Sequence, residues 1–305
     1  MKTRKLVLLI CDALLLVVLI LQLCLKAGDR TKNFTISDEV DEVTIANAEG
    51  SFSLVKENDS WFVGDKKYPA NETYTTALVE AGMNIKVLDK VASASNDAVL
   101  DRYELTEGER LEVTFKSKGK TVRSLYIGKE VNASSQTYAI FDDQKDIYLT
   151  AQNLRNEFDK SISYLRSRTV LDLDKTQISS VAITNEKGQT WSLARMGSGT
   201  DIVWNSSNEL LQIDETKATD WFNSLASLVT PSWYEEGENP GGQKIISAKI
   251  GVGFKTVSLE IYKLPDSGDS ASEKYWASCS ETPYPFEIAG YAVQKFQKSL
   301  EDMAK

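Results

Sequence analysis

The sequence predicts an α+β protein, with an N-terminal transmembrane helix followed by two tandem copies of a mostly antiparallel sheet with two helices each. Three observations predict this architecture. The chain begins with a basic stretch and a long apolar run, the remainder alternates short strand-like runs with helical ones, and the same series of runs recurs about 138 residues later. A series that recurs in order is typical of an internal duplication.

The apolar run is long enough to cross a membrane. Residues 6–25 consist of Leu, Val, Ile, Ala and Cys, interrupted only by Asp12 and Gln22. A helix of this length spans about 30 Å, the thickness of the hydrocarbon layer. Basic residues lie within residues 1–5, and the positive-inside rule places them in the cytoplasm. We therefore expect a bacterial signal-anchor, single-pass in the cell membrane, with the body on the extracytoplasmic side.

Two alternatives to a retained anchor stay open. A cleaved signal peptide has a shorter apolar core and a small-x-small cleavage site, which residues 23–29 match poorly. Cys24 would carry a lipid in a bacterial lipoprotein, but Leu23 is larger than the small residue usual before such a cysteine. The length of the run favours the retained anchor.

Composition excludes several kinds of site. Outside residues 1–30 the chain has 30 basic and 42 acidic residues, and this net charge of −12 argues against nucleic acid as a partner. The chain contains no histidine, which removes His-based catalysis and most zinc or iron sites. Cys279 is the single cysteine outside the apolar run, and we expect it half-buried in a strand. We predict no catalytic residue, no cofactor and no metal site.

The repeat is visible as paired runs. The alternating runs that correspond, in order, are 43–45 with 181–183, 52–54 with 191–193, 61–63 with 202–204, 120–122 with 255–257 and 138–140 with 275–277. A helix is expected after the third run of each copy, over residues 74–88 behind an Asn71 cap and over 218–229 behind an Asp214 cap. We place the first repeat at residues 34–168 and the second at 169–305.

The two copies also end in nearly the same five-residue segment, which we call the closing segment. Residues 158–162 read Phe-Asp-Lys-Ser-Ile, and residues 296–300 read Phe-Gln-Lys-Ser-Leu. Chance would supply one such match, but hardly the whole ordered series. The two closing segments therefore strengthen the prediction of a duplication.

Four short motifs carry a resemblance to a known family. They are the Trp-containing hairpin Ser60–Val63, the segment Tyr103–Leu105, the strand end Tyr126–Lys129 and the segment Leu165–Arg168. Together they resemble the bacterial family of the domain of unknown function 4340 (DUF4340). The chain departs from it at Glu104, where the family favours Gly, and by the lack of Pro after Leu105. The resemblance implies an accessory role beside membrane components of an ABC transporter of the gliding-motility type, and it implies no catalytic residues.

Two acidic motifs do not predict metal sites. Asp172 and Asp174 flank Leu173, and the alternation places both carboxylates on the wet face of a strand. Residues 266–273 are acidic and Ser-rich but lack the ligand order of a calcium loop, so we expect a solvated hairpin loop.

One aromatic pair is a candidate for binding a partner. Trp233 and Tyr234 precede the acidic, Pro- and Gly-bearing loop 235–242, and aromatic side chains beside such a loop would form a binding lip. The alternative interpretation is that both aromatics cap the helix expected to end near Thr230.

Three functions remain compatible with the sequence. We favour a non-enzymatic, membrane-anchored extracytoplasmic accessory or scaffold protein, in contact with the bilayer through residues 6–25 and with ABC-transporter-like membrane proteins. The alternative is a binding module for peptide, polysaccharide or lipid. A hydrolase that uses two carboxylates is the third, and the lack of histidine and of a nucleophile motif argues against it.

Overall fold

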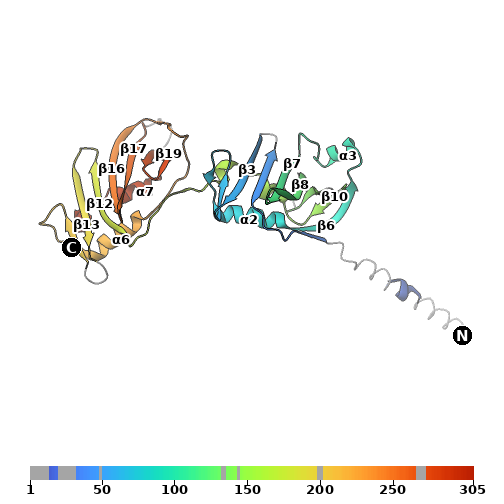
Figure 1. Ribbon diagram of the computed structural model, residues 1–305, viewed down its shortest axis with the longest axis horizontal. Helices are drawn as coiled ribbons and strands as arrows, with labels where there is room; N and C mark the ends of the chain where they lie inside the picture. The colour runs from blue at the N-terminus through green and yellow to red at the C-terminus, as the bar shows by residue number, and fades with distance from the viewer. Residues whose placement is uncertain are drawn as a thin grey trace, which may run out of the picture. The chain divides into compact units, whose positions relative to one another are not determined.

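The computed structural model describes residues 14–19, 32–47, 50–131, 135–142, 145–197, 202–265 and 273–305. These residues divide into two compact units, Met1–Ser167 (unit 1) and Arg168–Lys305 (unit 2). The boundary lies one residue before the one we expected. Residues 14–19 are helical (Figure 1), and their apolar side chains are exposed. Most of the apolar run 6–25 and the acidic residues 266–272 lie outside the described ranges. Among the residues that are described, no helix is both long and apolar enough to span a membrane.

The described strands of unit 1 form a ten-stranded antiparallel sheet in the order β1-β6-β10-β9-β8-β7-β2-β3-β4-β5. Its strands are β1 (Lys32–Thr35), β2 (Glu42–Asn47), β3 (Gly50–Glu57), β4 (Ser60–Val63), β5 (Tyr68–Pro69), β6 (Asn84–Ser93), β7 (Leu111–Ser117), β8 (Lys120–Glu130), β9 (Thr137–Phe141) and β10 (Asp146–Thr150). Its helices are α2 (Glu72–Met83), α3 (Asp97–Arg102), α4 (Leu154–Phe158) and α5 (Ile162–Leu165).

Helices cover the unit 1 sheet on two sides. On one side α2 and α4 pack over the central strands, where Gly82 of α2 lies against the ring of Phe115 in β7. That ring also meets Phe158 of α4 edge to face, with centroids 5.8 Å apart. On the other side α3 leads to the buried Leu105, beside Tyr103 and Tyr138, which form a second small core. The antiparallel sheet is thus buried at two places, as a layered α+β fold requires.

Unit 2 has a smaller sheet. Its described strands form a seven-stranded antiparallel sheet, β14-β13-β12-β16-β17-β18-β19, and a separate pair, β11-β15. Its strands are β11 (Thr169–Asp172), β12 (Ile178–Asn185), β13 (Thr190–Met196), β14 (Val203–Ser206), β15 (Ser227–Val229), β16 (Gln243–Val252), β17 (Lys255–Lys263), β18 (Tyr275–Cys279) and β19 (Thr282–Glu287). Its helices are α6 (Glu215–Leu225), α7 (Gly290–Phe296) and the 3-10 turn η1 (Glu301–Met303). The mostly antiparallel α+β class is therefore as predicted.

The two sheets have the same strand order. Read from the outer strand of the first hairpin, unit 1 runs β4-β3-β2-β7-β8-β9-β10, and unit 2 runs β14-β13-β12-β16-β17-β18-β19. The register agrees as well, since Trp61 of β4 lies opposite Lys56 and Trp204 of β14 lies opposite Arg195. In unit 1 the sheet continues into β6 and β1, whereas the corresponding β15 and β11 of unit 2 pair apart from the main sheet.

The main helix of each unit begins in the same way. Asn71 caps α2 by accepting from the Tyr74 N–H, and Asp214 caps α6 by accepting from two N–H groups of its first turn, as the sequence predicts. The cap N–H of Asn71 donates to the Leu165 carbonyl at 2.7 Å. The cap N–H of Asp214 donates to the Met303 carbonyl at 2.8 Å. The chain end of each unit therefore ties down the start of its main helix.

Both predicted helices are too long. The first ends at Met83 instead of Leu88, because Asn84 opens β6 and the next residues alternate between buried and exposed. The second ends at Leu225 instead of Val229, because Ser227–Val229 pairs with β11. An apolar run of this length does not by itself distinguish a helix from a helix followed by a strand.

Two further expectations need correction. The register pairs Ala139 with Ile127 and Ala277 with Ile261, so Tyr138 corresponds to Trp276 and not to Tyr275. A slip of one residue exchanges the two faces of a strand, and a match of residue types alone does not reveal such a slip. Cys279 is buried in β18 instead of half-buried, and this burial raises the pKa of its thiol.

Candidate functional site

The predicted aromatic pair lies along an edge strand of unit 2. Trp233 forms a β-bridge with Phe286 of β19, and the two rings meet at 5.9 Å between centroids. The N–H of the next residue, Tyr234, donates to the Pro285 carbonyl at 2.9 Å. Both aromatic residues are half-buried. They do not cap a helix, because α6 ends at Leu225 and β15 intervenes.

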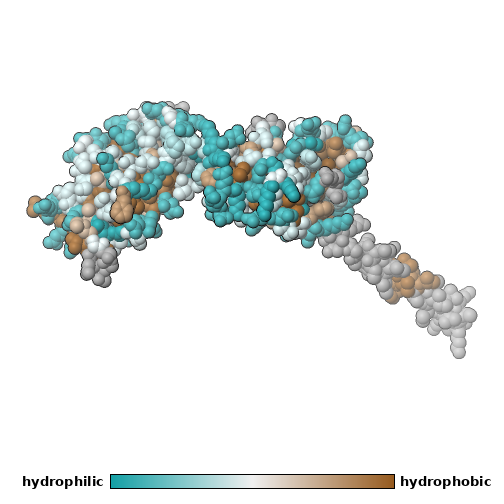
Figure 2. All heavy atoms as spheres, viewed as in Figure 1, coloured by the Kyte–Doolittle hydropathy of each residue, from teal (hydrophilic) through white to brown (hydrophobic). Residues whose placement is uncertain are grey.

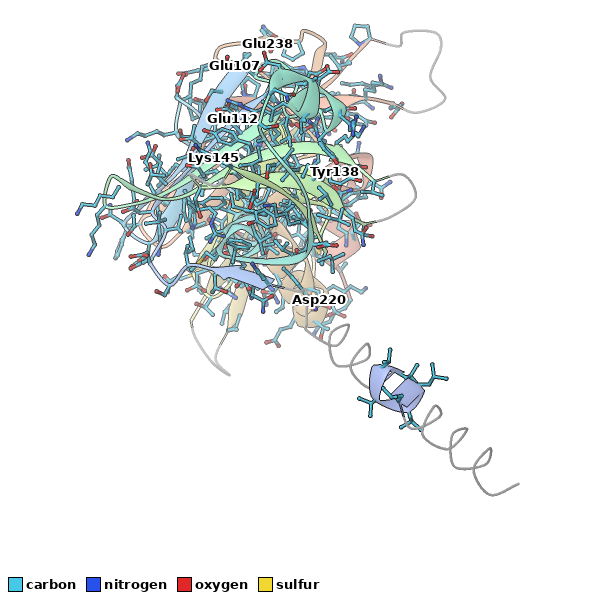
Figure 3. The ribbon with its side chains drawn as sticks, turned by 90° about the vertical axis from the view of Figure 1, so that its right-hand side faces the viewer. Glu107, Glu112, Tyr138, Lys145, Asp220 and Glu238 are labelled. Carbon is cyan, nitrogen blue, oxygen red and sulfur yellow. The ribbon has the colours of Figure 1, made fainter. Side chains whose placement is uncertain are left out.

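The loop that follows is acidic and exposed. Glu235, Glu236 and Glu238 are all exposed, and Figure 3 labels Glu238. The Glu238 carboxylate accepts a hydrogen bond from the N–H of Glu235 at 2.9 Å, which shapes the turn. The pKa of Tyr234 is raised by partial burial and by the nearby carboxylates of Glu287 and Glu238. Tyr234 therefore stays neutral beside a negatively charged loop.

A cleft of about 790 Å³ opens between the first hairpin and the chain end of unit 1. We call it the unit 1 cleft. Side chains that line it from both segments include Asn47, Ser51, Phe52, Lys160, Ser161 and Ile162. The Asn47 Nδ2 donates to Asp159 Oδ1 at 3.2 Å and links the hairpin to the closing segment.

A cleft of about 770 Å³ opens in unit 2 between the same two elements. We call it the unit 2 cleft. Side chains that line it include Asn185, Thr190, Trp191, Lys298, Ser299 and Leu300. The Asn185 Oδ1 accepts from the N–H groups of Lys187 and Gln189, each at 3.0 Å, and this holds the hairpin turn.

The six side chains of one cleft correspond to those of the other. The ladder pairs Ile45 with Phe52 and Ile183 with Trp191, so the aromatic residues stand at the same register position. The other hairpin residues of the two clefts correspond through the same ladders. Residues 160–162 correspond to residues 298–300 because the two closing segments match. In the sequence, the closing segments indicate a duplication but do not show that they line a cleft. Their repeated Lys-Ser pair was the signal that could have found it.

Lys160 of the unit 1 cleft and Lys187 and Lys298 of the unit 2 cleft have no carboxylate partner among the described residues. The Lys160 ammonium stands over the Tyr164 ring, 4.8 Å from its centroid, and Lys298 is exposed. The unit 2 cleft also holds Lys263, which pairs with Glu273, and Tyr275 donates to that same carboxylate. Lysine ammonium groups without a carboxylate partner are free to donate to a ligand.

Several described acidic groups have a pKa that clearly departs from its ordinary value. In each of them the pKa moves further from 7. The pKa is lowered at Asp146, Asp174, Glu260 and Glu273, and raised at Tyr234, Tyr262, Tyr275 and Cys279.

Asp172 and Asp174 are both exposed, as predicted, but only Asp172 lies in a strand, because β11 ends at that residue. The lowered pKa of Asp174 comes from its hydrogen bonds with Thr176. In the described part of the chain, no three residues of the His, Cys, Asp and Glu types come together as metal ligands.

Comparison with known proteins gives one match. The model of the family described as Domain of unknown function (DUF4340) matches residues 61–241, which begin in β4 and end just before β16. No curated protein and no solved structure matches the chain.

Proposed function

The chain belongs to the DUF4340 family, and we propose that it is a membrane-anchored extracytoplasmic accessory or scaffold protein of an ABC-type transport or surface-assembly system. It acts by binding and not by catalysis. Residues 6–25 anchor it as a single membrane-crossing helix, and the two α+β units lie outside the cytoplasm. The partners are membrane proteins of the transporter.

The exposed helix near the N-terminus supports the anchor. Its side chains, from Leu14 to Leu19, are apolar and 46–67% exposed, and Figure 2 colours them at the hydrophobic end of its scale. Apolar side chains without protein neighbours are unfavourable in water and favourable in a bilayer.

The observation that carries the scaffold role is the setting of Trp233 and Tyr234. Both are half-buried, and their backbone is held against β19 by the bridge to Phe286 and the bond to Pro285. Aromatic side chains fixed in this way lose little entropy on binding and serve as interface anchors. The adjacent exposed carboxylates favour a partner with a basic surface.

The shifted pKa values also favour a role in binding. A general acid or base works best when its pKa is brought toward the working pH. The carboxylates of Glu260 and Glu273 have lowered pKa values, and the hydroxyls of Tyr262 and Tyr275 have raised ones. At neutral pH these groups are held in one protonation state each, as in structural hydrogen-bond networks.

We further propose that the two units are tandem copies of one ancestral unit. The shared strand order, the matched positions of Trp61 and Trp204, and the equivalent helix caps at Asn71 and Asp214 support this origin. A duplication produces two similar surfaces in one chain, which a scaffold can present to more than one ligand.

Co-purification tests the scaffold proposal. The full chain, tagged at its C-terminus and extracted with detergent, should retain transporter-type membrane proteins, and the yield should fall as salt screens the acidic loop. Tyr234→Ala should reduce the retained partner by about tenfold, within the range of interface anchors. Tyr291→Ala is the matched control, because Tyr291 is an exposed tyrosine of the same unit on α7.

Circular dichroism separates a lost contact from a lost fold. A Tyr234→Ala chain that melts like the wild type and still retains all its partner would contradict the assignment of the aromatic pair. Wild-type chains that retain no membrane protein would contradict the scaffold role itself.

A second function, a binding module for peptide, polysaccharide or lipid, is favoured by the paired clefts. The described residues of each unit form a cleft of a size common for small ligands. This function does not compete with the first, because Trp233 and Tyr234 do not line either cleft.

A further inference from the structure

We propose that the unit 1 and unit 2 clefts are two equivalent saccharide sites, each of which holds a short stretch of a hydroxyl-rich polysaccharide. The inference rests on the second proposed function and names its ligand class. It is independent of the partner surface at Trp233 and Tyr234.

An aromatic ring stands at the same position of both clefts. Phe52 lines the first cleft and Trp191 the second, and each is half-buried. Trp191 packs against the buried Trp221, with centroids 5.2 Å apart, and is therefore rigidly held. The face of an aromatic ring carries partial negative charge and attracts the polarised C–H groups of a sugar ring.

Tyr164 adds a second aromatic ring to the unit 1 cleft. It is 40% exposed and stacks on Tyr74 with centroids 4.8 Å apart and planes 18° apart. The stack orders a side chain that would otherwise be mobile at the surface. Because Tyr74 stacks on this ring and the Lys160 ammonium lies over it, Tyr164 can contribute its phenolic hydroxyl, which both donates to and accepts from a sugar hydroxyl.

The polar side chains offer donors and acceptors together. The unit 1 cleft carries the Asp159 carboxylate beside the Lys160 ammonium, and the unit 2 cleft carries the Gln297 amide beside the Lys298 ammonium. A sugar hydroxyl both donates and accepts, so a mixed set satisfies it. An anionic lipid head group would instead meet carboxylates, such as Asp159 or Glu301 of the unit 2 cleft, at close range.

The repeated lysines distinguish a ligand site from a structural remnant. Other residues of the closing segments have structural roles. Phe158 and Phe296 are core residues, and Ser161 Oγ accepts from the Tyr164 N–H at 3.2 Å. Neither Lys160 nor Lys298 makes an ion pair in the described residues, and the contact of Lys160 with the Tyr164 ring has no counterpart among the contacts of Lys298. Both copies nonetheless hold lysine at this position, which is explained if the ammonium donates to a ligand.

Two like sites in one chain suit a ligand that repeats itself. A polysaccharide offers the same unit many times, and two linked sites hold such a polymer with higher avidity than one. A peptide of unique sequence gains nothing from a second identical site. The duplication therefore favours the polymer.

The experiment uses the full chain in a detergent without a sugar head group. An array of neutral hexose and N-acetylhexosamine oligomers and bacterial surface polysaccharides selects the best binder, and calorimetry then counts the sites for the corresponding oligosaccharide. We expect two sites per chain. Lys160→Ala and Lys298→Ala should each weaken one site by about tenfold, the loss typical of one charge-assisted hydrogen bond. The double variant should weaken both.

Matched controls are available in the same units. Lys120→Ala in unit 1 and Lys249→Ala in unit 2 remove exposed strand lysines that line neither cleft and should leave both sites unchanged. Ligand should also change the fluorescence of Trp191, and this change should need about tenfold more ligand in Lys298→Ala but not in Lys160→Ala.

The outcomes separate the ligand class from the binding function. Two lysine-dependent sites for a saccharide support the proposal. Lysine-dependent binding of a random peptide library or of lipid vesicles, without saccharide binding, overturns the ligand class and keeps the binding module. The absence of binding to saccharides, peptides and vesicles overturns both.

Discussion

Gly128 lies so close to the main-chain carbonyl oxygen of Tyr103 that a Cβ at position 128 would overlap it. The same oxygen accepts a hydrogen bond from the N–H of Lys129 at 2.9 Å, so β8 and the end of α3 are joined at this point. Both residues belong to motifs that carry the family resemblance, Tyr103–Leu105 and Tyr126–Lys129. Close approach of two backbones explains why glycine stands at the strand end.

Replacement of this glycine should therefore destabilise unit 1. In Gly128→Ala the new methyl group must push the Tyr103 carbonyl away or bend β8, because backbone atoms cannot rotate aside as a side chain can. We expect the free energy of unfolding to fall by about 2 kcal/mol or more, the range of overpacking and backbone strain. Urea unfolding followed by circular dichroism measures the loss.

Gly108→Ala is the matched control for this substitution. A Cβ at position 108 meets no atom within 4 Å and the backbone there is not left-handed, so stability should be nearly unchanged. Equal stability of Gly128→Ala and the wild type would show that the strand end and the helix end do not touch in solution.

Glu104 is a strained residue at the end of α3. The helix ends with the N–H of Leu105 donating to the Leu100 carbonyl and that of Glu104 to Asp101, a Schellman arrangement that needs a left-handed residue. Glu104 has φ of 54° there, at the position where the family favours glycine. We expect Glu104→Gly to raise the free energy of unfolding by about 0.5–1 kcal/mol.

The control is a glutamate in ordinary backbone. Glu107→Gly, at an exposed position in the turn after α3 (Figure 3), should slightly lower stability, because glycine gains freedom only in the unfolded chain. If both substitutions change stability by the same amount and in the same direction, strain at Glu104 is absent.

Local patterns in the sequence predicted the sheets and the helix starts but not the helix ends. Alternation marked β2, β3 and β4 because one face of each strand is buried, and the Asn71 and Asp214 caps were readable from residue type. The change from α2 to β6 occurs within an apolar run, where the two periods overlap. Tertiary pairing with β10 decides it.

The clefts depend on contacts that the sequence does not display. Asn47 and Asp159 are far apart along the chain and meet only because the closing segment returns to the first hairpin. The predicted pair Trp233 and Tyr234 is adjacent in sequence, so its proximity needed no fold. Its half-buried position against β19 could be seen only in the folded structure.

Alkaline pH should weaken unit 2 through Tyr262. Burial and the hydrogen bond to Glu260 raise the pKa of Tyr262 to about 12, above its ordinary value of 10.0. The folded state then binds the phenolic proton more tightly than the unfolded state does. This contribution to stability is complete below pH 10 and is lost as the pH rises from 10 through 12. Urea midpoints measured across that range should fall.

Tyr262→Phe identifies the source of this loss. The variant lacks the hydroxyl and should be less stable at neutral pH but show a shallower decline above pH 10, while the ring keeps its stack on Trp276. Tyr234 and Tyr275, whose pKa values are also raised, should leave a residual slope. An unchanged slope in Tyr262→Phe would rule out its role.

The last prediction concerns the retained anchor. If residues 6–25 remain as a membrane helix, the mature chain should keep Met1 and stay in the membrane fraction through carbonate washing, because about twenty apolar residues are too costly to release into water. Cys24→Ser separates this anchor from a lipid. The variant should behave as the wild type, since the helix and not the cysteine holds the chain. Release of the variant by carbonate would indicate a lipoprotein, and a soluble wild-type chain that begins near Ala27 would indicate a cleaved signal peptide.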